Sequence, residues 1–372
     1  MKIDDFIKGV CFEFTNKDDV LSTEELEVLK EKCTNINNMY EYNEAIEKIE
    51  EYKLHGVYID DFVKRDDIFV RWRDCGINHM FIHIKIKDNG RVPGNLINQK
   101  LTSYDCDNSE EYYFSYLLEK CHEYNIKPCI KFMTDSSITI DYVKNNTDRF
   151  FFQFKGIIRY LFSCDSNKYI DMITLANETN IIRKFAQLKS YWKDVIDMIH
   201  TSYKGMKVSA SQFCSDISTG EYDIADLLDI VGINRYPKNK NWPDSPSCEE
   251  ILPYMYNDAD IYHVQQFCKN NNKIFMISEC GVSHWGGQCR EPEMGNSMTN
   301  FYGKGYDYKM QAAYTKAAII ASKEMDYCVG HVIICGADYD PIFKFNYNNP
   351  ITGVIADNSY GFEAIKSVWG EN

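Results

Sequence analysis

The sequence lacks the features that several large protein classes require. It has no excess of positive charge, since 41 Lys and Arg residues stand against 55 Asp and Glu residues, a formal net charge of −14. Nucleic acids and anionic membranes attract basic surfaces, so we expect neither as a partner and favour a neutral substrate. No apolar run reaches the length of a membrane-spanning helix, and the charged first residues do not resemble a secretion signal. We therefore expect a cytoplasmic protein.

Motifs for cofactors and metals are also missing. No glycine-rich phosphate turn of the form GxGxxG or GxxxxGK[ST] is present, which counts against a doubly wound nucleotide-binding sheet. His79 and His83 are four residues apart, but they lie in a strand-like run, so the helical HExxH arrangement does not apply. Cys280 and Cys289 flank His284 without zinc spacing. We expect no cofactor and no metal.

Cysteine pairing is not indicated either. The 14 cysteines are scattered, with Cys11, Cys129 and Cys335 inside apolar strand-like runs and no CxxC pair. This distribution is typical of free thiols in a reducing compartment. A cysteine protease with Cys280 as its nucleophile has no supporting signature.

Short apolar runs alternate with amphipathic stretches along almost the whole chain. The apolar runs are rich in β-branched and aromatic residues, which favours strands over buried helices. The expected strands are Lys8–Phe14, Met80–Ile86, Lys127–Met133, Ile170–Ala176, Lys207–Ser211, Asp229–Asn234, Ile274–Ser278 and Gly330–Cys335. The expected helices are Asp60–Cys75, Glu110–Glu123, Thr147–Phe162, Ile181–Ser202, Ile224–Leu228, Ala259–Asn270, Tyr306–Lys323 and Gly361–Trp369. This alternation predicts an α/β fold, the (β/α)8 (TIM) barrel.

One segment interrupts the alternation. Residues 15–58 separate the first expected strand from the first barrel helix and hold two charged helical patterns, Thr23–Lys32 and Tyr42–Lys53. We expect a helical insertion on the C-terminal face of the barrel, either a solvated decoration or a wall of the active-site cleft. No linker or low-complexity tract is present, so residues 1–372 are predicted to form a single catalytic domain.

Two of the strand-like runs end on a glutamate. Glu178 follows the fourth expected strand and Glu279 follows the seventh. The C-terminal ends of barrel strands meet on one face, where active sites lie. Two carboxyls about 5–5.5 Å apart form the acid and the nucleophile of a retaining glycosidase. Either glutamate alone is also typical of a surface or salt-bridged residue, but the pair at matching strand ends favours a catalytic site.

Three motifs resemble those of glycoside hydrolase clan A. Leu175–Glu178 (LANE) resembles its Asn-Glu acid/base motif, and Ile277–Gly281 (ISECG) resembles its nucleophile motif. Val231–Tyr236 (VGINRY) resembles its sixth strand. The motifs occur in the order of the clan. The overall layout is most similar to the β-mannanases of family 113, with family 5 second.

The resemblance implies a TIM-barrel enzyme that hydrolyses a β-linked oligosaccharide or polysaccharide with retention and without a cofactor. Glu279 would be the nucleophile and Glu178 the acid/base. Asn177 would hold the sugar 2-hydroxyl, and Tyr236 would donate a hydrogen bond to Glu279. Asn234, in the same motif as Tyr236, is expected to contact substrate. A mannan-type substrate is favoured, and a β-glucan is next.

The sequence departs from the clan at two strands. The arginine that usually ends strand two is absent, and His83 and Lys85, which share a strand face, are the candidates to replace it. The tryptophan that usually ends strand eight is absent, and Asp338 follows that strand instead. Asp338 and Lys131, which closes strand three, are expected to bind sugar hydroxyls or to serve local structure.

Two tryptophans follow the sixth and seventh expected strands. Trp242 and Trp285 lie in loops on the predicted active-site face. Exposed aromatic faces stack on sugar rings, so both are candidate substrate contacts, and packing within the loops is the alternative.

Two other functions fit the same residues. A carbohydrate-binding barrel without turnover would explain the departures at strands two and eight. An unrelated barrel enzyme, such as an aldolase or isomerase, would use Lys131 as a base or Schiff-base former. For the hydrolase, an insertion that covers one end of the cleft would favour trimming of chain ends over internal cleavage.

Overall fold

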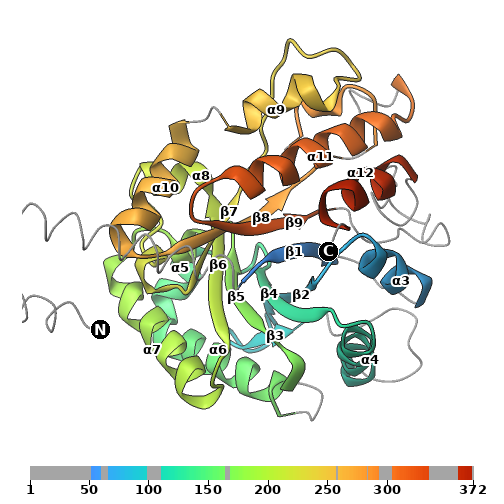
Figure 1. Ribbon diagram of the computed structural model, residues 1–372. Coiled ribbons are helices and arrows are strands. Elements are labelled where there is room, and N and C mark those ends of the chain that lie inside the picture. The colour runs from blue at the N-terminus through green and yellow to red at the C-terminus, as the bar shows by residue number, and fades with distance from the viewer. Residues whose placement is uncertain are drawn as a thin grey trace, which may run out of the picture. The chain divides into compact units, whose positions relative to one another are not determined.

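The computed structural model describes a barrel with helices outside its ring of strands (Figure 1). The described residues are 52–59, 66–98, 110–163, 168–256, 259–282, 284–292, 304–334 and 359–370. All of them belong to one compact unit, Tyr52–Asn372. The predicted (β/α)8 barrel is confirmed for this unit, whereas a single domain for the whole chain stays a prediction.

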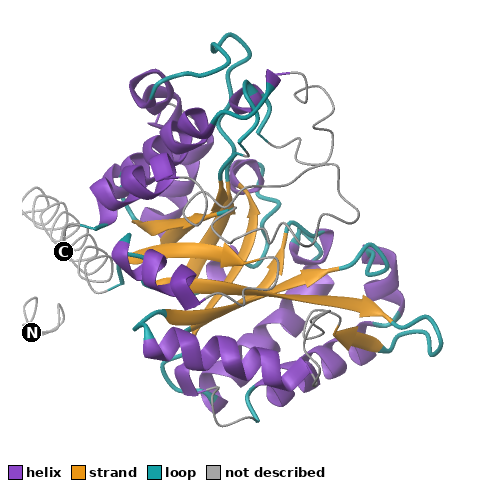
Figure 2. Ribbon diagram, turned by 90° about the vertical axis from the view of Figure 1, so that its right-hand side faces the viewer, coloured by secondary structure: helices purple, strands orange, loops and turns teal. Residues whose placement is uncertain are grey.

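The strands form one sheet that closes on itself. They are β1 (Leu54–Ile59), β2 (His79–Asp88), β3 (Leu96–Asn98), β4 (Lys127–Thr134), β5 (Met172–Asn177), β6 (Lys207–Phe213), β7 (Ile230–Asn234), β8 (Ile274–Cys280) and β9 (Cys328–Ile333). Eight are parallel neighbours in the ring order β1, β2, β4, β5, β6, β7, β8 and β9. The ring closes because β1 pairs with both β2 and β9. The short β3 pairs antiparallel with the end of β2 and forms a hairpin that projects beyond the ring (Figure 2).

The first strand of the ring is not the predicted one. The expected strand Lys8–Phe14 lies outside the described residues, and β1 fills the first position in the ring. All of β1 except Ile59 falls inside the range 15–58 assigned to the insertion, so that boundary was wrong at its C-terminal end, while residues 15–51 lie outside the described residues. Gly56 weakens the strand signal in the sequence. It is needed in the fold because a Cβ there would lie 2.9 Å from Val332 Cγ2.

Ten helices are described in the same residue ranges. They are α3 (Asp66–Asp74), α4 (Glu110–Glu123), α5 (Ile140–Asn145), α6 (Thr147–Leu161), α7 (Ala186–Ser202), α8 (Cys214–Ser218), α9 (Cys248–Tyr256), α10 (Ala259–Asn271), α11 (Tyr308–Glu324) and α12 (Ser359–Trp369). Most match expected helices, but α5, α8 and α9 were not predicted, and Ile224–Leu228 forms only a 3₁₀ turn at Ala225–Leu227.

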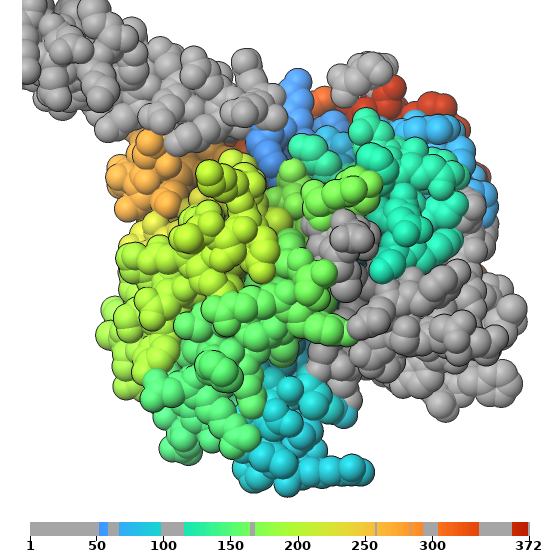
Figure 3. Space-filling model, turned by 90° about the horizontal axis from the view of Figure 1, so that it is seen from below, coloured from blue at the N-terminus to red at the C-terminus, as the bar shows by residue number. Residues whose placement is uncertain are grey.

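Helix positions follow from apolar spacing and caps. On α6, the buried residues Phe150, Phe154, Ile158 and Leu161 recur at intervals of three or four, which places them on one face. Asp307 caps α11 by accepting a hydrogen bond from Met310 N at 2.8 Å. In Figure 3 the segment around α6 and α7 (green) and the β2–β3 hairpin (cyan) make up much of the visible surface.

The interior of the barrel is unusually polar towards its C-terminal end. Lys131 on β4 is in register with His83 on β2 and with Thr174 on β5, and Thr174 is in register with Ser209 on β6. Residues in register on neighbouring strands face the same side of a sheet. All four are buried. On β5 this polar layer lies three residues before Asn177, the end of the strand, so it lies below the strand ends that carry the candidate site.

A second polar cluster, which is partly buried, lies at the opposite, N-terminal end of the barrel. Asp171, just before β5, accepts a hydrogen bond from Tyr52 OH. His79 Nε2 lies 3.5 Å from Asp171 Oδ2, and Lys127 Nζ lies 3.6 Å from Oδ1. Burial alone would raise the pKa of Asp171, but the close approach of His79, the hydrogen bond from Tyr52 and the charge of Lys127 outweigh it and lower this pKa to about 2.

The described ranges contain no helix that is long and apolar enough to cross a membrane. The same ranges hold no group of three or more His, Cys, Asp or Glu side chains placed to bind a metal ion. Nine cysteines fall within these ranges, and all nine are free thiols.

Candidate active site

Glu279 lies near the end of β8 and is 9% exposed. Tyr236 OH donates to its Oε2 at 2.8 Å, so the expected hydrogen bond between these residues is present. Lys131 Nζ donates to Oε1. Each carboxylate oxygen therefore has its own donor, and charge-assisted hydrogen bonds of this kind fix the orientation of the group.

Glu178 directly follows β5 and is exposed at the C-terminal end of the barrel. Its φ of 46° lies in the left-handed region, which costs a residue other than glycine on the order of 1 kcal/mol. The pairing of β5 with β6 is irregular between Thr174 and Asn177, and Glu178 N donates to Ser211 O at 2.9 Å. This local strain turns the Glu178 side chain out of the strand repeat, and such strain is concentrated at functional sites.

Asn234, the last residue of β7, connects the two sides of the site. Its Nδ2 donates to Glu178 Oε1 at 2.7 Å and to Asn177 Oδ1 at 3.0 Å. Its Oδ1 accepts a hydrogen bond from Ser278 Oγ at 2.6 Å. Because Ser278 precedes Glu279, one polar chain links the ends of β5, β7 and β8. Asn177 and Glu178 of the acid/base motif are thus both hydrogen-bonded to Asn234 of the sixth-strand motif.

The two glutamates have different electrostatic surroundings. Although Glu178 as a whole residue is exposed, protein atoms surround much of its carboxyl, and this desolvation raises the pKa of Glu178. The negative charge of Glu279 raises this pKa further, and the Asn234 hydrogen bond opposes both effects. Burial, followed by the charge of Glu279, also raises the pKa of Tyr236 well above its usual value. Tyr236 therefore remains a neutral donor to Glu279, and Glu178 is suited to hold a proton that it can give away.

The positive charge beside Glu279 does not come from strand two. Lys85 is 39% exposed and pairs with Asp135 at 3.3 Å, so its expected contact with substrate stays a prediction. The cation is Lys131, which the sequence placed among the sugar-binding candidates. His83 is buried, and its Nδ1 is hydrogen-bonded to Tyr58 OH at 2.7 Å.

Both loop tryptophans are buried, in contrast to the expectation of open stacking faces. Trp242 is 4% exposed and Trp285 is 7% exposed. Trp242 packs edge-on against Tyr254, with ring centroids 5.1 Å apart, and Trp285 packs on Tyr306 at 4.7 Å. This packing corresponds to the alternative expectation, and a contact of either tryptophan with substrate stays a prediction. Asp338 lies outside the described residues.

The sequence reasoning missed two residues of the site. Tyr58 was missed because its strand, β1, was assigned to the insertion. Ser278 was passed over although it lies inside the nucleophile motif, where a polar residue in a buried strand is a signal for a hydrogen-bonding role.

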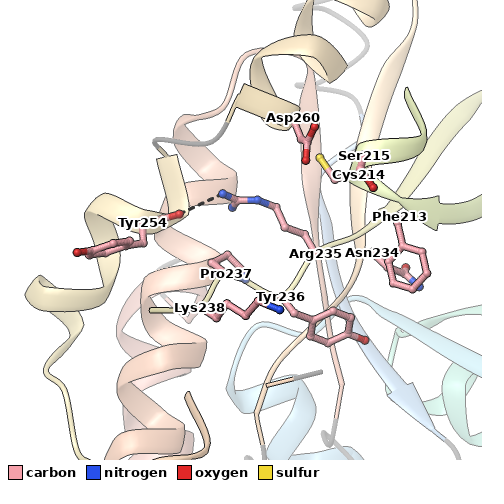
Figure 4. Close-up of a pocket in the computed structure, with 10 residues that line it drawn as sticks. All are labelled: Phe213, Cys214, Ser215, Asn234, Arg235, Tyr236, Pro237, Lys238, Tyr254 and Asp260. Atoms are coloured by element: carbon pink, nitrogen blue, oxygen red, sulfur yellow. Dashed lines mark hydrogen bonds between the residues drawn. The ribbon is translucent and has the colours of Figure 1, made fainter. Parts of the chain in front are cut away.

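A cavity of about 330 Å³ opens beside the site, between the ends of β6 and β7 (Figure 4). Its walls include Asn234, Tyr236, Phe213, Lys238 and Asp260. Phe213 ends β6 and is among the exposed large apolar residues. The neighbouring guanidinium of Arg235 points away from the barrel and donates to Tyr254 O at 3.1 Å (Figure 4).

No protein-family model matches this sequence, and no curated protein is similar enough to match it. Solved structures do match. A β-1,4-mannanase of glycoside hydrolase family 113 has a TM-score of 0.59 at 12% identity, covering 86% of this chain and 99% of the mannanase. A family 5 enzyme from Prevotella bryantii, solved with a xyloglucan tetradecasaccharide, has a TM-score of 0.54 at 12% identity, covering 87% of this chain and 98% of its own.

This chain has the barrel fold of those glycoside hydrolases. The fold also matches part of a larger protein, a β-glucuronidase from an uncultured Clostridium sp., with a TM-score of 0.56 at 15% identity over 86% of this chain and 50% of the glucuronidase. The resemblance to clan A seen in the motifs is thus confirmed for the fold. At these identities the similarity carries no further than the fold, and any activity has to be argued from the site.

Proposed function

We propose that this protein is a retaining β-glycoside hydrolase with Glu279 as nucleophile and Glu178 as acid/base. The observation that carries the proposal is the contrast between the two carboxyls. Glu279 receives a donor on each oxygen, whereas the pKa of Glu178 is raised by burial and by the charge of Glu279. A nucleophile held by two donors beside an acid whose pKa is raised is the combination that a retaining glycosidase needs.

The reaction proceeds in two steps. In the first, a Glu279 oxygen bonds to the anomeric carbon, the glycosidic C–O bond breaks, and the leaving oxygen takes the proton of Glu178. In the second, Glu178 removes a proton from water, and the water oxygen bonds to the anomeric carbon. The bond to Glu279 then breaks, and its electron pair returns to the carboxylate.

The remaining contacts support binding of sugar at this place. Asn177 is held by Asn234 beside Glu178, where its amide can reach a 2-hydroxyl. The cavity next to Asn234 and Tyr236 has room for a further sugar ring, with Phe213 as an exposed aromatic neighbour. The substrate we favour is a mannan-type oligosaccharide or polysaccharide, in line with the motif layout and the fold of the family 113 mannanase. A β-glucan is the second choice.

Covalent trapping tests the proposal. The protein is treated with a set of activated 2-fluoro β-glycosides and digested, and the labelled peptide is identified by mass spectrometry. We expect label on Glu279, none in a Glu279→Gln variant, and fastest reaction with the mannoside. Label on another residue would overturn the assignment of the nucleophile.

The same experiment separates the alternatives. Calorimetric binding of sugar without hydrolysis or label would indicate the carbohydrate-binding barrel. A Schiff-base enzyme is disfavoured by the structure, because Lys131 is 1% exposed and paired with Glu279. Borohydride trapping of a carbonyl substrate on Lys131 would reverse that conclusion.

A further inference from the structure

We propose that Lys131 is the positioning residue of Glu279 and that its ammonium group promotes the release of the sugar from Glu279 in the second step. This inference rests on the proposed hydrolase function. The positive charge beside Glu279, which the sequence predicted on β2 at His83 or Lys85, thus comes from Lys131 on β4.

The contact between Lys131 and Glu279 crosses the inside of the barrel. Their strands, β4 and β8, are separated by three strands on either side of the ring. Lys131 is nevertheless bonded to Glu279 Oε1, and it is 1% exposed. A charge this deep requires a partner of opposite sign, because water does not compensate it. The lysine stem thus spans the lumen to place its ammonium at the carboxylate.

The ammonium is also held from the side of β1. Lys131 Nζ lies 5.0 Å from the centre of the Tyr58 ring, within the range of a cation–π contact. Tyr58 is itself held by the hydrogen bond of 2.7 Å between its hydroxyl and His83 Nδ1. The chain His83, Tyr58, Lys131, Glu279 therefore connects β2, β1, β4 and β8. Through this chain His83 is connected to Glu279 without a direct contact being needed.

The two donors on Glu279 differ in charge. Tyr236 is a neutral hydroxyl on Oε2, and Lys131 is a cation on Oε1. When one oxygen is bonded to the sugar, Glu279 is a neutral ester and Lys131 has lost its opposite charge. When the ester bond breaks, the electron pair returns to Glu279 and the ion pair forms again. Lys131 stabilises the charge that develops on the departing carboxylate, so it favours the second step over the intermediate.

The consequence is a change in which step limits turnover. Without Lys131, breakdown of the glycosyl-enzyme slows and the intermediate accumulates. A residue that served only to hold the fold would not change the ratio of the two steps. Accumulation of the ester is therefore the readout that separates positioning from structure.

The experiment compares wild type with Lys131→Met on the 2,4-dinitrophenyl β-glycoside of the sugar identified by trapping. This leaving group departs without help from Glu178, so release of the phenol reports the first step and steady-state turnover reports the second. We expect kcat to fall about a hundredfold, KM to fall with it, and a burst of dinitrophenol to appear. Intact-protein mass spectrometry should show a glycosyl adduct that wild type does not accumulate.

Lys193→Met is the matched control. Lys193 is an exposed lysine that pairs with Asp197 on α7, so the same change of residue is made outside the site. We expect its kinetics to equal those of wild type. If Lys131→Met does not fold, as judged by far-UV circular dichroism, Lys131→Gln replaces it, since the amide suits the polar lumen. The folded variant must show the same adduct.

Two outcomes overturn the inference. One is a folded Lys131 variant with wild-type kcat. The other is a slower variant without burst or adduct, which would place the effect in the first step or in the fold. Failure of the proposed function looks different, because the wild type itself would then show neither hydrolysis nor label on Glu279.

Discussion

The two ends of the barrel hold carboxylates with similar neighbours and opposite shifts in pKa. At the N-terminal end, Asp171 has a tyrosine hydroxyl, a histidine and a lysine around it, and its pKa falls to about 2. At the C-terminal end, Glu279 also has a tyrosine hydroxyl and a lysine, but a second carboxyl, Glu178, lies within range of its charge. That second acid has a raised pKa.

The two ends differ in how many of their carboxyl groups have hydrogen-bond donors or positive charges beside them. Around Asp171 the donors outnumber the one carboxylate, so the ionised form is stabilised and contributes to folding. Around Glu279 the donors serve one acid, and the other acid is pushed towards its protonated form. We therefore expect the same types of residue to stabilise the fold at one end and, in the proposed hydrolase, to prepare a proton at the C-terminal face of the barrel.

Removing Glu279 should have the largest effect on activity. We expect Glu279→Gln to lower kcat on the order of 10⁵-fold, because no other group can form the glycosyl-enzyme. The rate of hydrolysis is measured with aryl β-glycosides. Far-UV circular dichroism shows separately whether the variant is folded. A variant that retains more than a small fraction of the rate would move the nucleophile to another residue.

Removing Glu178 should have a smaller effect that depends on the leaving group. We expect Glu178→Gln to lower kcat/KM about 10³-fold for a poor leaving group and much less for dinitrophenol. In wild type, the acid works while protonated, so kcat/KM should fall as pH rises through the raised pKa of Glu178. This alkaline limb should be absent in the variant. An unchanged pH profile would remove Glu178 from the acid role.

Tyr236 offers a milder change at the same end. Tyr236→Phe deletes the 2.8 Å hydrogen bond to Glu279 Oε2 and leaves the ring in place. We expect kcat to fall about tenfold to a hundredfold, since the ammonium of Lys131 still holds the other oxygen. Steady-state kinetics measures the effect, with Tyr262→Phe on the exposed side of α10 as control.

The opposite end should respond in stability and not in activity. We expect Asp171→Asn to lower the free energy of unfolding by about 2 kcal/mol at pH 7. The folded-state pKa of Asp171 is below its unfolded value, so this stabilisation is present above the unfolded pKa of about 3.9 and is lost as pH falls towards 2.

Urea denaturation at several pH values measures the effect, with the exposed Asp197→Asn as control. The wild-type and Asp171→Asn stabilities should converge in acid. An Asp171→Asn variant that loses activity but keeps wild-type stability would contradict the contrast between a stabilising N-terminal end and an active C-terminal end.

The sequence predicted the parts of this molecule that depend on short-range patterns. Seven strands of the ring were found because each is an apolar run between amphipathic helices. β1 was missed because Gly56 interrupts its apolar pattern, and this glycine is required by the approach of Val332, a residue far along the chain. The catalytic candidates were found because their motifs are local, as in Asn177 and Glu178.

Contacts across the lumen and within loops were beyond prediction. The contact between Lys131 and Glu279 depends on which strands lie opposite each other in the closed ring and on the register of those strands. A local sequence pattern predicts neither the order of the strands nor their register. Burial of Trp242 and Trp285 depends on aromatic partners such as Tyr254 and Tyr306, which come from other segments. The sequence could therefore name candidate groups but could not decide which of them meet.

The left-handed backbone at Glu178 has a practical consequence for the choice of variants. A φ of 46° suits glycine and asparagine, whereas alanine has no side-chain hydrogen bond to offset its steric cost there. A Glu178→Ala protein would mix relaxation of the loop with loss of the proton donor. Glu178→Gly and Glu178→Asn both suit the turn and both remove the carboxyl, one with the whole side chain and one with a shorter amide in its place, so agreement between these two would isolate the chemistry of this position from its geometry.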